Sequence, residues 1–328
     1  MSLASPSVDE LVRGVRAGER SLVARAITLV ESGREADRAG AHEVLSALLP
    51  ENPASLRVGI SGPPGVGKST LIEALGLMLI DAGQRVGVLA VDPSSTVSGG
   101  SILGDKTRMN ALAQADAAFV RPSPSAAHLG GVARRSREAL LVLEAAGFDT
   151  LLVETVGVGQ SETLVSEMTD HFVVLAQPGT GDELQGIKRG ILELAEIVVV
   201  HKADGERMAL ARDAATQLSS ALRIARGARS DWRVQSASSL EGTGLAELVA
   251  ALRERDAART QSGAKEARRR DQRAFWMQRA VRDEIERQLV ARAGWAERVA
   301  ELETRVRAGE EPPSAAREAV RRALDELR

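Results

Sequence analysis

The sequence LRVGISGPPGVGKSTLIEALGLML, residues 56–79, decides the fold. It reads as a short apolar strand, a glycine-rich turn and a helix that carries Leu71, Leu75 and Leu79. The turn, residues 62–69, matches the pattern G-x-x-x-x-G-K-[ST] in full, between the strand and the helix that this pattern requires. Glycines there let backbone N–H groups surround phosphate oxygens at a helix N-terminus, so we expect a phosphate-binding loop.

Each residue of this loop is a predicted nucleotide contact. We expect the Lys68 ammonium to reach the β and γ phosphates, Ser69 to ligate Mg²⁺ and Thr70 to contact the α phosphate. The predicted contacts are Gly62, Pro63, Pro64, Gly65, Val66, Gly67, Lys68, Ser69 and Thr70.

Further apolar runs follow the loop and alternate with helical stretches; they are RVGVLAVD, TLLVET, HFVVLAQ, EIVVVHK and WRVQSAS. Strands that alternate with helices indicate a parallel sheet covered on both faces. The predicted class is α/β, a P-loop NTPase with a mainly parallel sheet flanked by helices and with helical extensions at both ends.

Three domains are expected. Residues 1–55 form a helical extension, residues 56–256 a nucleotide-binding domain, and residues 257–328 a helical arm rich in Arg and Glu. Two apolar stripes run along this arm, one from Met277 to Leu289 and one from Trp295 to Val306. Such stripes must be buried, either against the rest of the chain or in a dimer.

Composition excludes several classes of protein. The 328 residues are 44% hydrophobic and 27% charged, with a net charge of −2, so nothing indicates a nucleic-acid footprint. Cysteine is absent, which excludes disulfides, iron–sulfur clusters and thiolate metal sites. No apolar run is long enough to span a membrane, and the first residues do not resemble a secretory signal. We therefore expect a cytoplasmic protein that binds neither membranes nor nucleic acid.

Three acidic residues are placed to assist Ser69 in binding Mg²⁺, which prefers hard oxygen ligands. Asp92 and Glu154 close apolar runs, and Asp105 lies in the glycine-containing segment GGSILGDKTRM. An acid at the carboxyl end of a parallel strand lies at the edge where such sheets bind ligands. We expect Ser69, Asp92, Asp105 and Glu154 to be metal ligands, directly or through water.

A second motif indicates the base. His201, Lys202 and Asp204 belong to HKAD, which follows an apolar run and resembles the N-K-x-D guanine signature. A carboxylate at Asp204 can accept hydrogen bonds from guanine N1–H and N2–H₂, which adenine lacks, and the Lys202 stem can lie over the base. Ser236, Ala237 and Ser238 resemble the loop whose backbone contacts guanine O6. His201 replaces the usual Asn, and its ring can still donate to the phosphate loop.

Taken together, these residues resemble the MeaB/ArgK family of P-loop GTPases, which includes the human methylmalonic aciduria type A protein. The resemblance covers nearly the whole chain and is carried by GPPGVGKST, AVDPSS, SGGSILGDKTRM, ETVGVGQSE and QPGTGDELQGIKRGI. It implies a GTP-hydrolysing chaperone of an adenosylcobalamin-dependent mutase, either methylmalonyl-CoA or isobutyryl-CoA mutase. It also implies a homodimer held by the C-terminal arm, with GTP or GDP and Mg²⁺ bound.

The resemblance also assigns roles to residues. Residues 154–157 correspond to switch II, and residues 177–188 to a further switch that communicates with the mutase. The expected catalytic residues are Lys68, Asp105, Glu154 and Lys188. No glutamine directly follows the switch II glycine at 157, so we expect slow hydrolysis that a partner accelerates.

Two alternatives stay open at this point. One is an ATP-dependent kinase linked to basic amino-acid transport, against which HKAD argues. The other is an interaction protein that binds nucleotide only structurally, against which the intact Lys68 and Ser69 argue.

Overall fold

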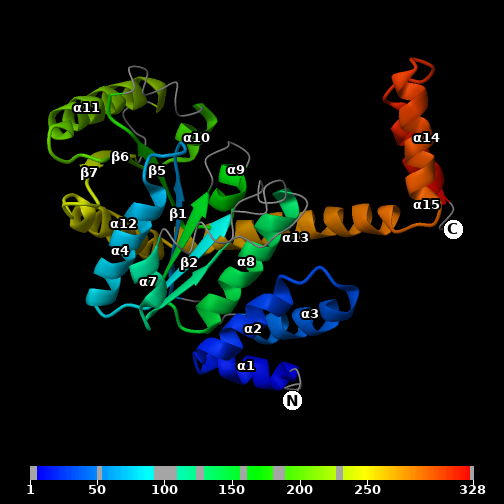
Figure 1. Ribbon diagram of the computed structural model, residues 1–328, viewed down its shortest axis with the longest axis horizontal. Helices are drawn as coiled ribbons and strands as arrows, with labels where there is room; N and C mark the ends of the chain where they lie inside the picture. Colours follow the sequence, from blue (N-terminus) through cyan, green and yellow to red (C-terminus); the bar gives the residue numbers. More distant parts are fainter. Residues whose placement is uncertain are drawn as a thin grey trace. The chain divides into compact units, whose positions relative to one another are not determined.

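The chain folds around one parallel sheet with the strand order β3-β2-β4-β1-β5-β6-β7 (Figure 1). The computed structural model describes residues 6–49, 54–91, 109–122, 129–155, 161–179, 189–226 and 232–325. Within these residues every strand pairing is parallel, which confirms the predicted α/β class. The strands are β1 (Leu56–Ser61), β2 (Val86–Val91), β3 (Ala118–Arg121), β4 (Thr150–Thr155), β5 (His171–Ala176), β6 (Ile197–His201) and β7 (Arg233–Ala237).

The central strands are apolar because both of their faces are covered. All residues of β2, β4, β5 and β6 are buried. The apolar runs predicted these strands correctly, together with β1 and β7. Strand β3 was not predicted: it is four residues long, lies at the edge of the sheet and ends on the charged Arg121.

Helices lie on both faces of the sheet. One core cluster joins the strands to α4 (Lys68–Asp81), α12 (Leu245–Gln261) and the short α7 (Asn110–Gln114), through Leu75, Leu248 and Leu112 among others. The opposite face is covered by α8 (Leu129–Ala145) and α9 (Ser161–Ser166), whose Leu143 and Val165 lie against the strand glycines Gly87 and Gly59. The structure also describes α10 (Arg189–Leu194) and α11 (Arg207–Arg226) in this region.

The N-terminal extension is helical, as predicted. It comprises α1 (Val8–Arg16), α2 (Arg20–Val30), a 3₁₀ turn (Glu35–Asp37) and α3 (Arg38–Ala47). Ser7 and Glu10 form a reciprocal capping box at the start of α1. The apolar stripe of α1 is buried, and both α1 and α2 contact α8.

The C-terminal region is also helical, with α13 (Ala264–Val290), α14 (Trp295–Arg307) and α15 (Ala315–Asp325). The chain divides into two compact units, residues 1–269 and residues 270–328. The division into domains at residues 55 and 256 stays a prediction. None of the helices in the described ranges is long and apolar enough to cross a membrane.

Candidate nucleotide-binding site

The phosphate loop leaves β1 at the carboxyl edge of the sheet and turns directly into α4. Gly67 caps this helix in the left-handed region, with φ of 100°. A Cβ atom on Gly67 would lie 2.6 Å from the His201 ring, and one on Gly62 would lie 2.7 Å from the carbonyl oxygen of Leu175. Glycine is therefore required at both positions, and the loop N–H groups lie at a helix N-terminus suited to anions.

Lys68 is buried across this loop. Its Nζ donates to the carbonyl oxygens of Gly62 at 2.9 Å and Pro63 at 3.3 Å. The side chain thus places a positive charge inside the turn of the loop, where the sequence predicts the β and γ phosphates.

Ser69 and Glu154 come together although they are 85 residues apart in sequence. The Ser69 hydroxyl donates to Oε1 of Glu154 at 2.9 Å. Glu154 lies on β4 in register with Ile60 of β1, and the next residue, Thr155, donates to the Ser61 hydroxyl at 2.9 Å. The carboxyl ends of β1 and β4 are therefore tied together beside the phosphate loop.

These donors fit Mg²⁺ in their chemistry. Ser69 and Glu154 offer a hydroxyl and a carboxylate, both hard oxygen ligands, and Mg²⁺ commonly keeps water and phosphate as its other ligands. Among the residues that the structure describes, no group of three or more His, Asp or Glu side chains could hold a metal ion. The other two predicted ligands, Asp92 and Asp105, lie outside the described residues.

His201 ends β6 and joins two loops. Its Nδ1 lies 2.8 Å from the carbonyl oxygen of Val66, and its Nε2 lies 2.7 Å from the Ser239 hydroxyl. Because a carbonyl can only accept, Nδ1 carries the proton, and Nε2 of the neutral ring accepts from Ser239. Burial lowers the pKa of His201 below its ordinary value, and the charge of Lys202 acts in the same direction, so the ring is neutral at pH 7. The ring thus contacts the phosphate loop, as the sequence suggested.

Lys202 adopts the left-handed conformation, with φ of 59°. Its Nζ donates to the Gly65 carbonyl oxygen at 2.6 Å and lies 3.4 Å from Oε1 of Gln177. A residue held in this strained region commonly marks a functional site. Here the lysine stem crosses from the end of β6 to the phosphate loop.

Asp204 is nearly buried, and two side chains hold its carboxylate. Oδ2 accepts from the Ser238 hydroxyl at 2.8 Å, and Oδ1 accepts from Arg207 at 2.9 Å. Ser238 is fully buried, whereas the Arg207 side chain is half exposed. The carboxylate is therefore fixed on its Ser238 side, and its partner on the other side reaches solvent.

The loop after β7 contributes Ser238, one of the three residues that the sequence predicts there, and in addition Ser239. Ser236 points to α11, with its hydroxyl 3.3 Å from the carbonyl oxygen of Ala211, and Ala237 is a buried strand residue. The contacts to Asp204 and His201 come from Ser238 and Ser239. Sequence reasoning missed Ser239 and Arg207. The turn glycines Gly242 and Gly244 were the signal in the sequence that could have found Ser239, because they indicate that the loop begins after Ala237.

Several predicted residues cannot be placed. Lys188, Asp92 and Asp105 lie outside the described residues, as do the second half of the segment 154–157 and residues 180–188. The structure brings together Lys68, Ser69 and Glu154 on one side of the phosphate loop, and Lys202 and Asp204 on the other side. The residues predicted to bind phosphate and those predicted to read the base thus share one sheet edge, at the carboxyl ends of β1, β4, β6 and β7.

The sequence matches the family described as "Methylmalonyl Co-A mutase-associated GTPase MeaB" over residues 23–294. A "Probable GTPase Mb1533" of Mycobacterium bovis is 53% identical over 94% of this chain and 93% of its own length. The mouse "Methylmalonic aciduria type A homolog, mitochondrial" is 42% identical over 94% of this chain and 77% of its own length.

Among solved structures, the "Crystal structure of LAO/AO transport system kinase" superposes with a TM-score of 0.74 at 35% identity, covering 99% of this chain and 100% of that chain. The phosphate loop, the base site and these similarities agree, and the chain belongs to the MeaB family of methylmalonyl-CoA mutase-associated GTPases.

Proposed function

We propose that this protein hydrolyses GTP as a cytoplasmic chaperone of an adenosylcobalamin-dependent acyl-CoA mutase, chiefly methylmalonyl-CoA mutase. In this proposal it gates cofactor loading and protects or reactivates the mutase. The observation that carries the nucleotide assignment is the Asp204 carboxylate, fixed by Ser238 next to a lysine that reaches the phosphate loop. The family supports the choice of partner.

The base site favours guanine over adenine. A fixed carboxylate accepts from the guanine N1–H and N2–H₂ groups, while adenine offers an unprotonated N1 and no 2-amino group. Arg207 is half exposed, so it can swing away from the Asp204 oxygen that a base would occupy. The backbone contact to guanine O6 is proposed to come from the segment Ser236, Ala237 and Ser238, and Ser239 supports this segment through its hydroxyl bond to His201.

On the phosphate side, Lys68 neutralises charge on the β and γ phosphates, and the loop N–H groups orient them. Ser69 and Glu154 would hold Mg²⁺ with Asp92 and Asp105, directly or through water, and the ion would neutralise charge that develops on the phosphates. Lys188 is proposed to add positive charge in the transition state. Hydrolysis is proposed to be slow alone and faster with the mutase.

A homodimer through the C-terminal arm forms part of the proposal. Met277, Val281 and Ile285 lie four residues apart on α13 and are 58%, 50% and 51% exposed. An apolar stripe on a helix is stable in water when another surface covers it. A second copy of the arm offers the same stripe, which suits a symmetric interface.

The test is phosphate release from GTP and from ATP, with and without purified methylmalonyl-CoA mutase. We expect slow, GTP-selective release that the mutase accelerates. If methylmalonyl-CoA mutase leaves the rate of phosphate release from GTP unchanged but isobutyryl-CoA mutase raises it, isobutyryl-CoA mutase would be the partner instead. Preferential ATP turnover would refute the base assignment and favour the transport-linked kinase, the function named for the superposed crystal structure.

A further inference from the structure

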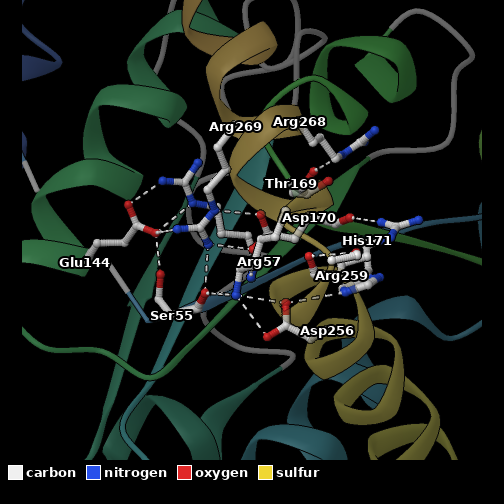
Figure 2. A network of polar contacts seen from close by, with 12 residues as sticks. Ser55, Arg57, Glu144, Thr169, Asp170, His171, Asp256, Arg259, Arg268 and Arg269 are labelled. Atoms are coloured by element: carbon white, nitrogen blue, oxygen red, sulfur yellow. Dashed lines mark hydrogen bonds and ion pairs between the residues drawn. The ribbon is translucent and has the colours of Figure 1, made fainter. Parts of the chain in front are cut away.

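A buried ionic network lies at the amino edge of the sheet, opposite the nucleotide site (Figure 2). Its centre is Asp170, which precedes β5 and is 1% exposed. Arg269 of α13 grips this carboxylate with two hydrogen bonds, of 2.7 and 2.6 Å, and the backbone N–H of Arg57 donates to it at 3.0 Å. Burial alone would raise the pKa of Asp170, but the bonds and charge of Arg269 hold it below the ordinary value. The carboxylate is therefore ionised, and α13 is fastened to β1 and β5.

A second carboxylate extends this network. Glu144 of α8 accepts two hydrogen bonds from the Arg57 guanidinium, at 2.6 and 2.5 Å, and one from the Ser55 hydroxyl. The carbonyl oxygen of Ser55, directly before β1, accepts from both Lys265 and Arg269. The first turns of α13 thus bind the segments that enter β1 and β5.

Arg268 differs from Arg269 in the kind of group that it binds: its two hydrogen bonds go to backbone carbonyl oxygens and not to a carboxylate. Its guanidinium donates to the carbonyl oxygens of Ser166 at 2.9 Å and Thr169 at 3.1 Å, as Figure 2 shows for Thr169. Ser166 is the last residue of the short helix α9, where helical carbonyls have no partner within the helix, and Thr169 lies in the segment that follows it. Arg268 therefore caps α9 with a positive charge, which also suits the helix dipole.

Helix α9 in turn lies tightly on the strand that leads to the phosphate loop. A Cβ atom on Gly59 of β1 would lie 3.0 Å from both the Val165 and the Thr169 side chains. The next residue of β1, Ile60, is in register with Glu154, which binds Ser69. A shift of α9 would therefore press on β1 at Gly59, one residue before Ile60, and so act on the strand that is in register with Glu154.

We propose that Arg268 is a positioning residue for GTP hydrolysis: by capping α9 it fixes β1 and β4, and with them the Glu154–Ser69 pair. Arg268 touches neither nucleotide nor metal, and it acts through α9. The inference rests on the proposed function, because it presupposes both GTP turnover and the magnesium site at Ser69 and Glu154.

The test replaces Arg268 in the full chain by Gln, which removes the positive charge, and by Lys, which keeps the charge but lacks the guanidinium group that donates to two carbonyl oxygens at once. We expect R268Q to lower kcat for GTP by about tenfold with KM unchanged, as loss of a supporting contact commonly does. A second measurement does not depend on turnover: Mg²⁺ is titrated, and the binding of a fluorescent GDP analogue is recorded. The Mg²⁺ concentration needed for half-maximal binding should be several-fold higher for R268Q than for the wild type. R268K should show a smaller loss in both measurements.

The matched control is R270Q, which removes an exposed arginine two positions along the same helix. R270Q should leave kcat and the Mg²⁺ dependence unchanged. A lower melting temperature of R268Q with unchanged kcat and Mg²⁺ dependence would overturn the positioning role, as would equal losses in R270Q. If R268Q does not fold, R268K decides, and wild-type values in both of its measurements would overturn the proposal. Absence of GTP hydrolysis by the wild type would instead refute the proposed function, and this inference with it.

Discussion

At the scale of single residues, His201 shows how a substitution inside a motif is accommodated. The ring uses Nδ1 for the Val66 carbonyl and Nε2 for the Ser239 hydroxyl. Both ring nitrogens are therefore engaged within the protein, and neither is left to contact a base. His201 ties the phosphate loop to the loop after β7, and we propose that the choice of base rests on Asp204.

Asp204→Asn tests this division of labour. The amide cannot accept from both N1–H and N2–H₂, and a charge-assisted bond is worth about 1.5–3 kcal/mol, so GTP binding should weaken by about 10- to 100-fold. Xanthosine triphosphate has a carbonyl in place of the 2-amino group, which the Asn amide can contact, and its binding should improve. Competition against a fluorescent GDP analogue measures both. Equal weakening of the two nucleotides would show that Asp204 does not read the base.

At the scale of elements, the amino edge of the sheet carries a titratable group. His171 opens β5 and is fully buried, with Nδ1 2.8 Å from Glu196 and Nε2 3.6 Å from Asp256. Burial lowers the pKa of His171, but the nearby Asp256 carboxylate and the hydrogen bond and charge of Glu196 outweigh it despite the nearby Arg259, so the pKa is raised above 6.5. The folded protein therefore holds a proton there that the unfolded chain releases.

The sign of the pH dependence follows from this raised pKa. Below pH 6.5, the His171 contribution to the free energy of unfolding is fully present, and it is lost as the pH rises through the folded-state value. Urea denaturation from about pH 6 to about pH 9 should show stability falling more steeply for the wild type than for H171Q, whose amide does not titrate. Parallel curves for the two proteins would contradict a proton held at His171.

The elements also show what sequence patterns can predict. The runs behind β2, β4, β5 and β6 were predictable because strands buried on both faces are continuously apolar. The Ser-Ala pair at the end of β7 indicated a loop that includes Ser238, but it gave no sign of Ser239, whose partner His201 lies 38 residues away in the sequence. The bond between Arg57 and Asp170 joins residues 113 apart, and no local pattern encodes such a pairing.

At the scale of the whole molecule, the exposed stripe of α13 predicts the state of assembly. We expect a dimer in solution, and V281E combined with I285E to give a monomer, because the two new carboxylates of each copy would be buried in the interface. Light scattering after gel filtration measures the mass. The control is R282E, a charge change at an exposed position beside the stripe. A wild-type monomer, or a dimeric double variant, would contradict assembly through this face.

The position of Arg269 in the sequence has a consequence for the order of folding. Its guanidinium binds the Asp170 carboxylate and the Ser55 carbonyl oxygen, two groups 115 residues apart, and it comes after the last strand of the sheet, β7. A chain that is still being synthesised therefore holds Asp170 without this partner until residue 269 has been made. Because an unpaired buried carboxylate is costly, the entrances of β1 and β5 reach their final packing only after α13 has begun to form.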